Sequence, residues 1–250
     1  MGNKMDFAYV LSGLLVGTIV GMTGVGGGSL MTPLLIVLFG VQPPVAVGTD
    51  LLYAALTKTG GAWVRIRSGQ VDWRISGLLA SGSLPAALLT LALLNAADRH
   101  ALSSIISTSL GVALILTAGA LLYKERAFIR LSDKHITAAT VATGAMLGIL
   151  VTISSVGAGA LGTVALYYLY PRLTADRVIG TDIAHAVPLT LIAGAGHFAL
   201  GTVDFHLLLN LLLGSLPGIF IGSRLGSKIP EKMLRGALAG MLFLIGGILI

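Results

Sequence analysis

Cysteine is absent from this chain of 250 residues. Its absence excludes a disulfide framework, thiolate metal sites, iron–sulfur ligation and cysteine nucleophiles. Charged residues are scarce as well: they make up 10% of the chain, against about 25% in an average soluble protein. So few charges cannot cover the surface of an ordinary soluble domain.

Apolar residues fill most of the sequence instead. Hydrophobic residues make up 55% of it, and the mean hydropathy of +0.94 extends over the whole length. Side chains of this composition must face lipid or one another. The net charge of +6 would suggest a nucleic-acid partner in a soluble protein, but here the basic residues fall mainly between apolar stretches. The composition therefore predicts an integral membrane protein in the lipid bilayer, with no nucleic-acid partner.

Ten apolar stretches follow one another along the chain; they cover residues 7–22, 29–41, 44–64, 75–95, 101–123, 136–153, 158–170, 174–200, 205–223 and 233–250. Several have the roughly 20 residues that span a bilayer as a helix. Two are shorter, 29–41 and 158–170, and each follows a glycine-rich interruption, 24–28 and 157–159. Such segments are typical of broken or re-entrant helices. We expect an all-α polytopic membrane protein with about 8–10 membrane segments.

The basic residues predict which loops lie in the cytoplasm. Lysine and arginine gather in the loops 65–74, 124–135, 171–177 and 224–235, whereas the gap around 201–204 holds neither. Loops rich in these residues stay on the cytoplasmic side. We therefore expect these four loops inside and both chain termini outside, with Lys4 and Arg99 as exceptions.

The second half of the sequence repeats the first at an offset of 131 to 132 residues. The matching blocks are Val25-Gly26-x-Gly28-x-Leu30-x-Thr32 with Val156-Gly157-x-Gly159-x-Leu161-x-Thr163, Gly48-Thr49-Asp50 with Gly180-Thr181-Asp182, Gly69-x-Val71-Asp72-Trp73 with Gly201-x-Val203-Asp204-Phe205, and Ser83-Leu84-Pro85 with Ser215-Leu216-Pro217. Four blocks in the same order predict an internal duplication. The first repeat covers 1–123, a charged cytoplasmic linker covers 124–135, and the second repeat covers 136–250.

The two repeats are expected to have inverted topology. The loop 65–74 is basic, while its equivalent near 201 contains no lysine or arginine, so the two loops are predicted to face opposite sides of the membrane. Inverted repeats with paired broken helices are typical of secondary transporters, whose substrate site lies near the bilayer midplane where the breaks meet.

These motifs resemble those of the TauE/SafE sulfite exporter family, also called the 4-toluene sulfonate uptake permease family (TSUP). The resemblance lies in Gly21-Met22-Thr23-Gly24-Val25-Gly26-Gly27-Gly28-Ser29-Leu30-x-x-Pro33, in Ala46-Val47-Gly48-Thr49-Asp50-Leu51 and in Gly69-x-Val71-Asp72-Trp73, each echoed in the second half. The chain departs from the family pattern at Asp50 and Asp182, where serine is usual. The resemblance implies a transporter of sulfur-containing or organic anions, such as sulfite, sulfonates or sulfoacetate-like compounds, in a prokaryotic cell (inner) membrane.

The two glycine-rich motifs are the centre of the predicted substrate site. Glycine lets the backbone open a helix whose first N–H groups have no partner within the helix. Those groups, together with the positive end of the helix dipole, attract an anion. The alternative is that the glycines only permit tight helix packing. The predicted substrate-binding residues are Thr23, Gly26, Gly27, Gly28, Ser29, Thr32, Lys58, Ser154, Ser155, Gly157, Gly159 and Thr163.

Lys58 lies in the middle of the apolar stretch 44–64. A lone ammonium at that depth must face a cavity or a carboxylate. Asp50 comes eight residues earlier and falls on nearly the same face of a helix. We interpret Lys58 as the cation that binds the anion, with Asp50 as its partner when the site is empty; a structural ion pair or snorkelling to an interface is the alternative.

Asp50 and Asp182 are equivalent in the repeat, and His185 follows Asp182 by about one helical turn. A carboxylate–imidazole pair can relay protons within a membrane, so these residues are candidates for coupling to a proton, with another cation as the other option. Thr49, Asp50, Thr181 and Asp182 alternatively cap helix starts or bond to backbone near the breaks. No cofactor or metal site is expected, because the histidines and acidic residues form no compact ligand motif.

The sequence thus predicts a secondary transporter that moves a small anion by alternating access, rather than an enzyme. An anion channel is one alternative. A less favoured one is an intramembrane hydrolase, with Ser29 or Ser155 as nucleophile and His185 or His197 as base. The glycine-rich and alanine-rich helix faces suit either internal packing or a homodimer.

Overall fold

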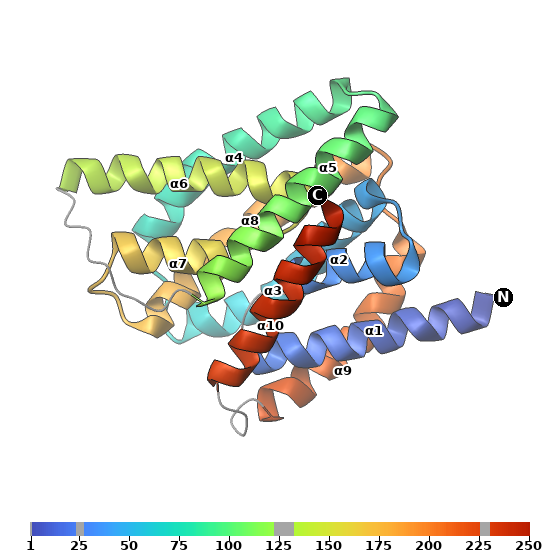
Figure 1. Cartoon of the computed structure of the whole chain (residues 1–250). Coiled ribbons are helices and arrows are strands. Elements are labelled where there is room, and N and C mark those ends of the chain that lie inside the picture. Colours follow the sequence, from blue (N-terminus) through green and yellow to red (C-terminus); the bar gives the residue numbers. More distant parts are fainter. Residues whose placement is uncertain (1, 24–27, 123–132, 226–230) are drawn as a thin grey trace.

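The computed structural model describes residues 2–23, 28–122, 133–225 and 231–250, and these residues form ten helices and no strands (Figure 1). The helices follow the ten apolar stretches of the sequence, so the all-α class is confirmed. In chain order they are α1 (Gly2–Thr23), α2 (Gly28–Phe39), α3 (Pro43–Arg67), α4 (Trp73–Ala96), α5 (Arg99–Leu122), α6 (Asp133–Ser154), α7 (Ala160–Leu169), α8 (Ala175–Ala199), α9 (Phe205–Leu225) and α10 (Glu231–Leu249).

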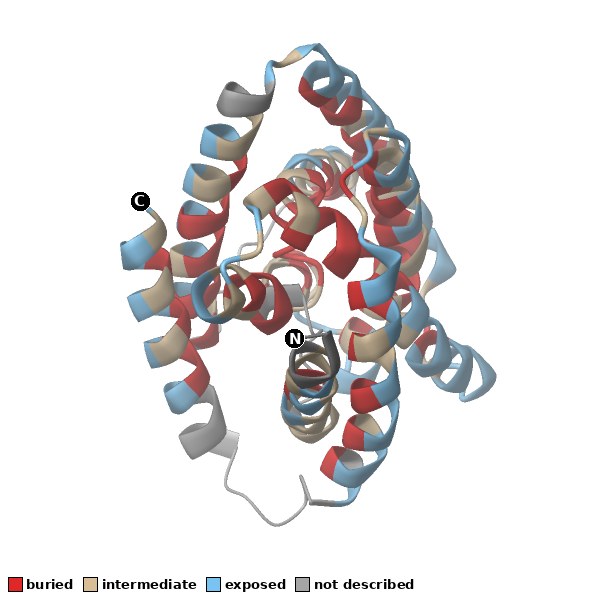
Figure 2. Cartoon of the chain, turned by 90° about the vertical axis from the view of Figure 1, so that its right-hand side faces the viewer, coloured by how far each residue is buried: buried red, intermediate tan, exposed pale blue. Residues whose placement is uncertain are grey.

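The lengths and apolar surfaces of the helices are those of an integral membrane protein. Five of the described helices are long and apolar enough to cross a bilayer, within α4, α5, α6, α8 and α9. Buried residues gather on the faces that the helices turn toward one another, and exposed ones on the outside (Figure 2). Large apolar side chains stand on that outside, among them Leu38, Leu93, Leu213 and Leu244. Lipid is the solvent that this exposed surface requires.

Two helices are too short to cross the membrane. Helix α2 has 12 residues and α7 has 10. At 1.5 Å per residue they extend over about 18 and 15 Å, whereas the hydrocarbon core is about 30 Å thick. Helix α7 begins inside the protein, where Ala158 and Ala160 are buried. Each short helix packs against a long one, α2 on α3 and α7 on α8.

The long helices associate in pairs. Helix α1 packs along α9, α4 along α6, α3 along α8, and α5 along α10 (Figure 1). Glycine permits the first two contacts, because a Cβ atom on Gly17 of α1 would overlap the backbone of Ser215, and a Cβ on Gly148 of α6 would overlap that of Ser83. Small residues at such crossings let helix backbones approach closely in membranes.

Helices α3 and α8 run antiparallel through the interior. Thr49, near the start of α3, accepts a hydrogen bond from the amide of Asp204, which lies beyond the end of α8 (3.0 Å). In the opposite sense, Thr181 near the start of α8 accepts one from the amide of Asp72, beyond the end of α3 (2.9 Å). The side chain of each aspartate also accepts hydrogen bonds from the helix that follows it. Asp72 accepts from two backbone amides of α4, and Asp204 accepts from one of α9. Near the starts of the two helices, Thr49 and Asp50 of α3 and Thr181 and Asp182 of α8 are consequently buried.

Candidate functional site

Two buried carboxylates lie where the short helices meet the long ones. Asp50 of α3 is 0% exposed and Asp182 of α8 is 1% exposed. Oγ1 of Thr32, on α2, donates to Oδ2 of Asp50 at 2.5 Å. Oγ1 of Thr163, on α7, donates to Oδ2 of Asp182 at 3.3 Å. A hydrogen bond from a threonine hydroxyl to an aspartate carboxylate therefore joins each short helix to a long one.

Lys58 extends from α3 to the loop that precedes α7. Its ammonium donates to the backbone carbonyl of Ala158 at 2.9 Å, and it interacts electrostatically with Asp182 and Asp50. We expected Asp50 to be its partner. No ion pair closer than 4.0 Å joins Lys58 to either carboxylate among the described residues. For Asp50 the reason is spacing, because eight residues of helix separate it from Lys58 by about 12 Å along the axis.

The loop before α7 has an unusual backbone. Ser155 has φ +58°, and Gly157 and Gly159 have φ +117° and +124°. Glycine adopts such angles at little cost, while a serine there is strained. Oγ of Ser154, a predicted substrate ligand, donates to the carbonyl of Leu150 at 2.6 Å at the end of α6. The strained loop carries the carbonyl that binds Lys58.

The start of α7 is occupied by a carboxylate of the chain itself. The amide of Gly159 and the hydroxyl of Thr163 both interact with Asp182. Gly162 makes the approach possible, because a Cβ atom there would overlap Oδ1 of Asp182. A negative charge is favoured at a helix N-terminus. The sequence predicted an external anion at this place, and in the structure Asp182 stands there.

The first glycine-rich motif can be followed only in part. The predicted contacts of Thr23, Gly26, Gly27, Gly28 and Ser29 lie outside the residues whose side chains the structure describes. Among the described residues of this motif, Thr32, one helical turn into α2, contacts the site through its hydrogen bond to Asp50.

His185 is bonded to a serine rather than to Asp182. Its Nε2 lies 2.8 Å from Oγ of Ser83 on α4, and both residues are 0% exposed. The predicted Asp182–His185 pair is not formed as a hydrogen bond between described atoms. Ser83 was missed as a site residue, although its motif repeats as Ser215-Leu216-Pro217. His197 has both ring nitrogens within 2.9 Å of partners, Thr202 and the carbonyl of Thr152, and belongs to the scaffold.

Seven buried side-chain polar atoms have no hydrogen-bond partner among the described residues. Four of them are Oδ1 of Asp50, Oδ1 of Asp182, Oγ of Ser155 and Nδ1 of His185, and the other three belong to Tyr53, Thr117 and Thr152. Ser155 lies beside Asp50 and interacts with it, though without good hydrogen-bond geometry. A buried polar atom without a partner destabilises the fold by about 1–3 kcal/mol. Asp50, Asp182 and His185 also interact electrostatically with Lys58, and buried polar atoms without partners beside a charged side chain mark this region as the candidate functional site.

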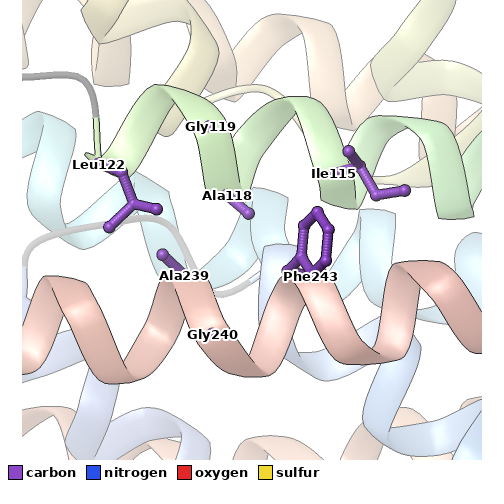
Figure 3. Close-up of a pocket in the computed structure, with 7 residues that line it drawn as sticks. All are labelled: Ile115, Ala118, Gly119, Leu122, Ala239, Gly240 and Phe243. Atoms are coloured by element: carbon purple, nitrogen blue, oxygen red, sulfur yellow. The ribbon is translucent and has the colours of Figure 1, made fainter.

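A groove lies on the outer surface, between α5 and α10 (Figure 3). It is lined by Ile115, Ala118, Gly119, Leu122, Ala239, Gly240 and Phe243. None of these side chains carries a charge or a polar group, so this groove has nothing with which to hold an anion.

Comparison with known proteins agrees with this picture. The chain is 39% identical to "Probable membrane transporter protein YjnA" of Bacillus subtilis (strain 168), over 84% of this chain and 85% of that protein. It is 26% identical to "Probable membrane transporter protein YdhB" of the same organism, over 82% and 83%. No solved structure gives a significant match.

The fold, the transporter relatives and the enclosed polar site fit one family. The sequence model described as "Sulfite exporter TauE/SafE" matches residues 9–249, nearly the whole chain. The chain is therefore a membrane transporter protein of the TauE/SafE sulfite exporter family.

Proposed function

We propose that this protein is a secondary transporter of small sulfur-containing or organic anions, such as sulfite or organosulfonates, and that Lys58 binds the anion. The observation that carries the proposal is the position of the Lys58 ammonium. Lys58 is half-buried on the long helix α3, and its ammonium donates to the carbonyl of Ala158 at 2.9 Å. It interacts electrostatically with Asp50, Asp182 and His185, each of which has a buried polar atom without a hydrogen-bond partner among the described residues. An arriving anion would exchange with that carbonyl as the partner of the ammonium.

The contacts of α3 and α8 support alternating access between two inverted halves, residues 1–123 and 136–250. The bonds Thr49–Asp204 and Thr181–Asp72 join equivalent residues at opposite ends of the antiparallel pair. Two halves related in this way can exchange their conformations, which opens the site first to one side and then to the other. With the basic loops in the cytoplasm, both termini lie outside.

The test is flux through purified protein in liposomes. Uptake of radiolabelled sulfite, sulfoacetate and taurine is measured against concentration. A transporter saturates as its site fills, whereas a channel does not over the same range. Lys58→Ala should lower the initial rate at least about 30-fold, because truncating one partner of a charged hydrogen bond that is shielded from water costs about 2–5 kcal/mol.

Arg172→Ala is the matched control, since it removes one positive charge from an exposed loop position and should leave the rate within twofold. Saturable uptake that survives Lys58→Ala would overturn the role of the lysine. Absence of flux for all three anions would overturn the substrate class.

A further inference from the structure

The carboxylate of Asp182 already occupies the place that best suits a small anion. It lies at the N-terminus of the ten-residue helix α7, where the amide of Gly159 and the hydroxyl of Thr163 face it. Lys58 is the cation that interacts with it. Its Oδ1 is buried and has no hydrogen-bond partner among the described residues. A substrate anion would seek the same amide, hydroxyl and ammonium.

We propose that Asp182 is a built-in competitor of the substrate: an anion takes its place only after the carboxylate has accepted a proton, so that one proton crosses the membrane with each anion. This inference rests on the proposed anion transport and names its coupling ion. The proton forms the O–H bond of the neutral acid on loading. It leaves on the other side of the membrane when the anion departs and the carboxylate returns to α7.

Charge at the site makes the proton necessary. Lys58 supplies one positive charge, while ionised Asp50 and Asp182 supply two negative ones. A further anion would leave two uncompensated negative charges in the interior, and burying unpaired charge is strongly unfavourable. Neutralising one carboxylate lowers this excess and frees the ammonium for the substrate.

The groups around Asp182 come from several helices. Helix α3 contributes Lys58, which also interacts with Asp50 and with His185. Its own helix contributes His185, which is bonded to Ser83 of α4. Helix α7 and its loop contribute a hydroxyl and an amide, neither of which titrates. Lys58 is therefore the group whose charge keeps Asp182 in place when the anion is absent.

The structure favours Asp182 over Asp50 as the carboxylate that is displaced. Asp50 is bonded to Thr32 at 2.5 Å and has Ser155 beside it. The corresponding Thr163–Asp182 hydrogen bond is longer, at 3.3 Å. Asp182, whose threonine lies farther from it, is therefore the carboxylate that an anion can replace.

The experiment measures accumulation at equilibrium in proteoliposomes, with the anions sulfite and sulfoacetate each used as tracer. The membrane potential is held at zero, so only the pH gradient can drive accumulation. One proton per anion predicts about a tenfold accumulation for one pH unit, acid outside, because a factor of ten corresponds to about 1.4 kcal/mol. Two protons predict about a hundredfold accumulation, and no coupling predicts none.

Variants assign the proton to its residue. Asp182→Asn should let the tracer equilibrate without accumulation. Asp50→Asn should slow uptake and retain the tenfold accumulation. Asp176→Asn is the matched control, because Asp176 lies on the same helix with its side chain 68% exposed; it should behave like the wild type.

Wild-type protein alone can overturn the inference if Asp182→Asn does not fold. Saturable uptake without accumulation, or a hundredfold accumulation, would contradict a single displaced carboxylate. Accumulation that persists in Asp182→Asn, or is lost only in Asp50→Asn, would contradict the assignment. These outcomes leave anion transport standing, whereas absence of any flux would overturn the proposed function itself.

Discussion

Residues of the first half and those 131 or 132 positions later make the same kinds of contact. The hydroxyls of Thr49 and Thr181 each accept a hydrogen bond from a backbone amide just beyond the end of the antiparallel partner helix. Asp50 and Asp182 each accept a hydroxyl from a short helix. These paired contacts suggest that the scaffold of the site is built twice.

The chemistry of the site is present only once. Lys58 is replaced in the second half by Thr190, whose Oγ1 donates to the carbonyl of Ala186 within its own helix at 2.8 Å. His185 stands where the first half has Tyr53. Beside the carboxylates, Gly162 corresponds to the fully buried Met31. The paired positions therefore differ in charge, and Lys58 has no lysine or arginine as its counterpart in the second half.

The largest effect in this comparison is expected at Gly162. Gly162→Ala places a Cβ atom against Oδ1 of Asp182, and overpacking of this kind destabilises by about 1–3 kcal/mol. Because the displaced group is the site carboxylate, the initial rate of anion uptake should fall about tenfold or more.

The control for this change is Gly77→Ala on α4, where an added Cβ atom meets nothing within 4 Å. Uptake rates are compared in liposomes at equal protein content. A normal rate for Gly162→Ala would mean that the close approach of α7 to Asp182 has no part in transport.

Thr49→Val and Thr181→Val test whether the two halves are equivalent. Each change leaves a backbone amide at the start of α9 or α4 without its acceptor, which should cost about 1–3 kcal/mol of unfolding free energy. The two losses should agree within about 0.5 kcal/mol. Unfolding in mixed micelles, followed by the fluorescence of the two tryptophans, measures them.

Thr190→Val serves as control for this pair. Its hydroxyl donates hydrogen bonds to carbonyls of its own helix. Loss of that hydroxyl should therefore change the unfolding free energy by less than about 0.5 kcal/mol. If one threonine proves essential and the other neutral, the two ends of the α3–α8 pair are not equivalent.

The smallest difference is expected between Ser83 and Ser215. Ser83→Ala removes the bond to Nε2 of His185 at 2.8 Å and should cost about 0.5–1.5 kcal/mol of unfolding free energy. Ser215→Ala should cost less, because its hydroxyl has only a 3.4 Å contact with the carbonyl of Leu212 and a weak interaction with Tyr53. The same unfolding assay compares them, and an equal or larger loss at Ser215 would contradict this difference.

Much of the fold follows from patterns along the chain. The ten apolar stretches predict the ten helices, and the glycine-rich interruptions predict that α2 and α7 are short. Asp72 and Asp204 come directly before α4 and α9, where a carboxylate can accept free backbone amides. These features depend on residues close together in sequence.

The hydrogen-bond partners within the site could not be predicted as fully from the sequence. The repeat pointed to Asp50, Asp182 and their threonines, and hydropathy pointed to Lys58. The partner of Lys58 is the carbonyl of Ala158, one hundred residues away, and any residue type could have supplied that carbonyl. Ser83 and His185 meet only because α4 packs on α8. No spacing rule predicts such contacts between distant helices.

The exchange of Asp182 for the substrate is the central claim, and counting protons during binding tests it most directly. Purified protein in weakly buffered detergent solution, well above neutral pH, is mixed with sulfite or sulfoacetate while an indicator dye follows the pH. The account predicts about one proton taken up per anion bound by the wild type and none by Asp182→Asn. Anion binding to the wild type without proton uptake, or equal uptake by both proteins, would contradict it.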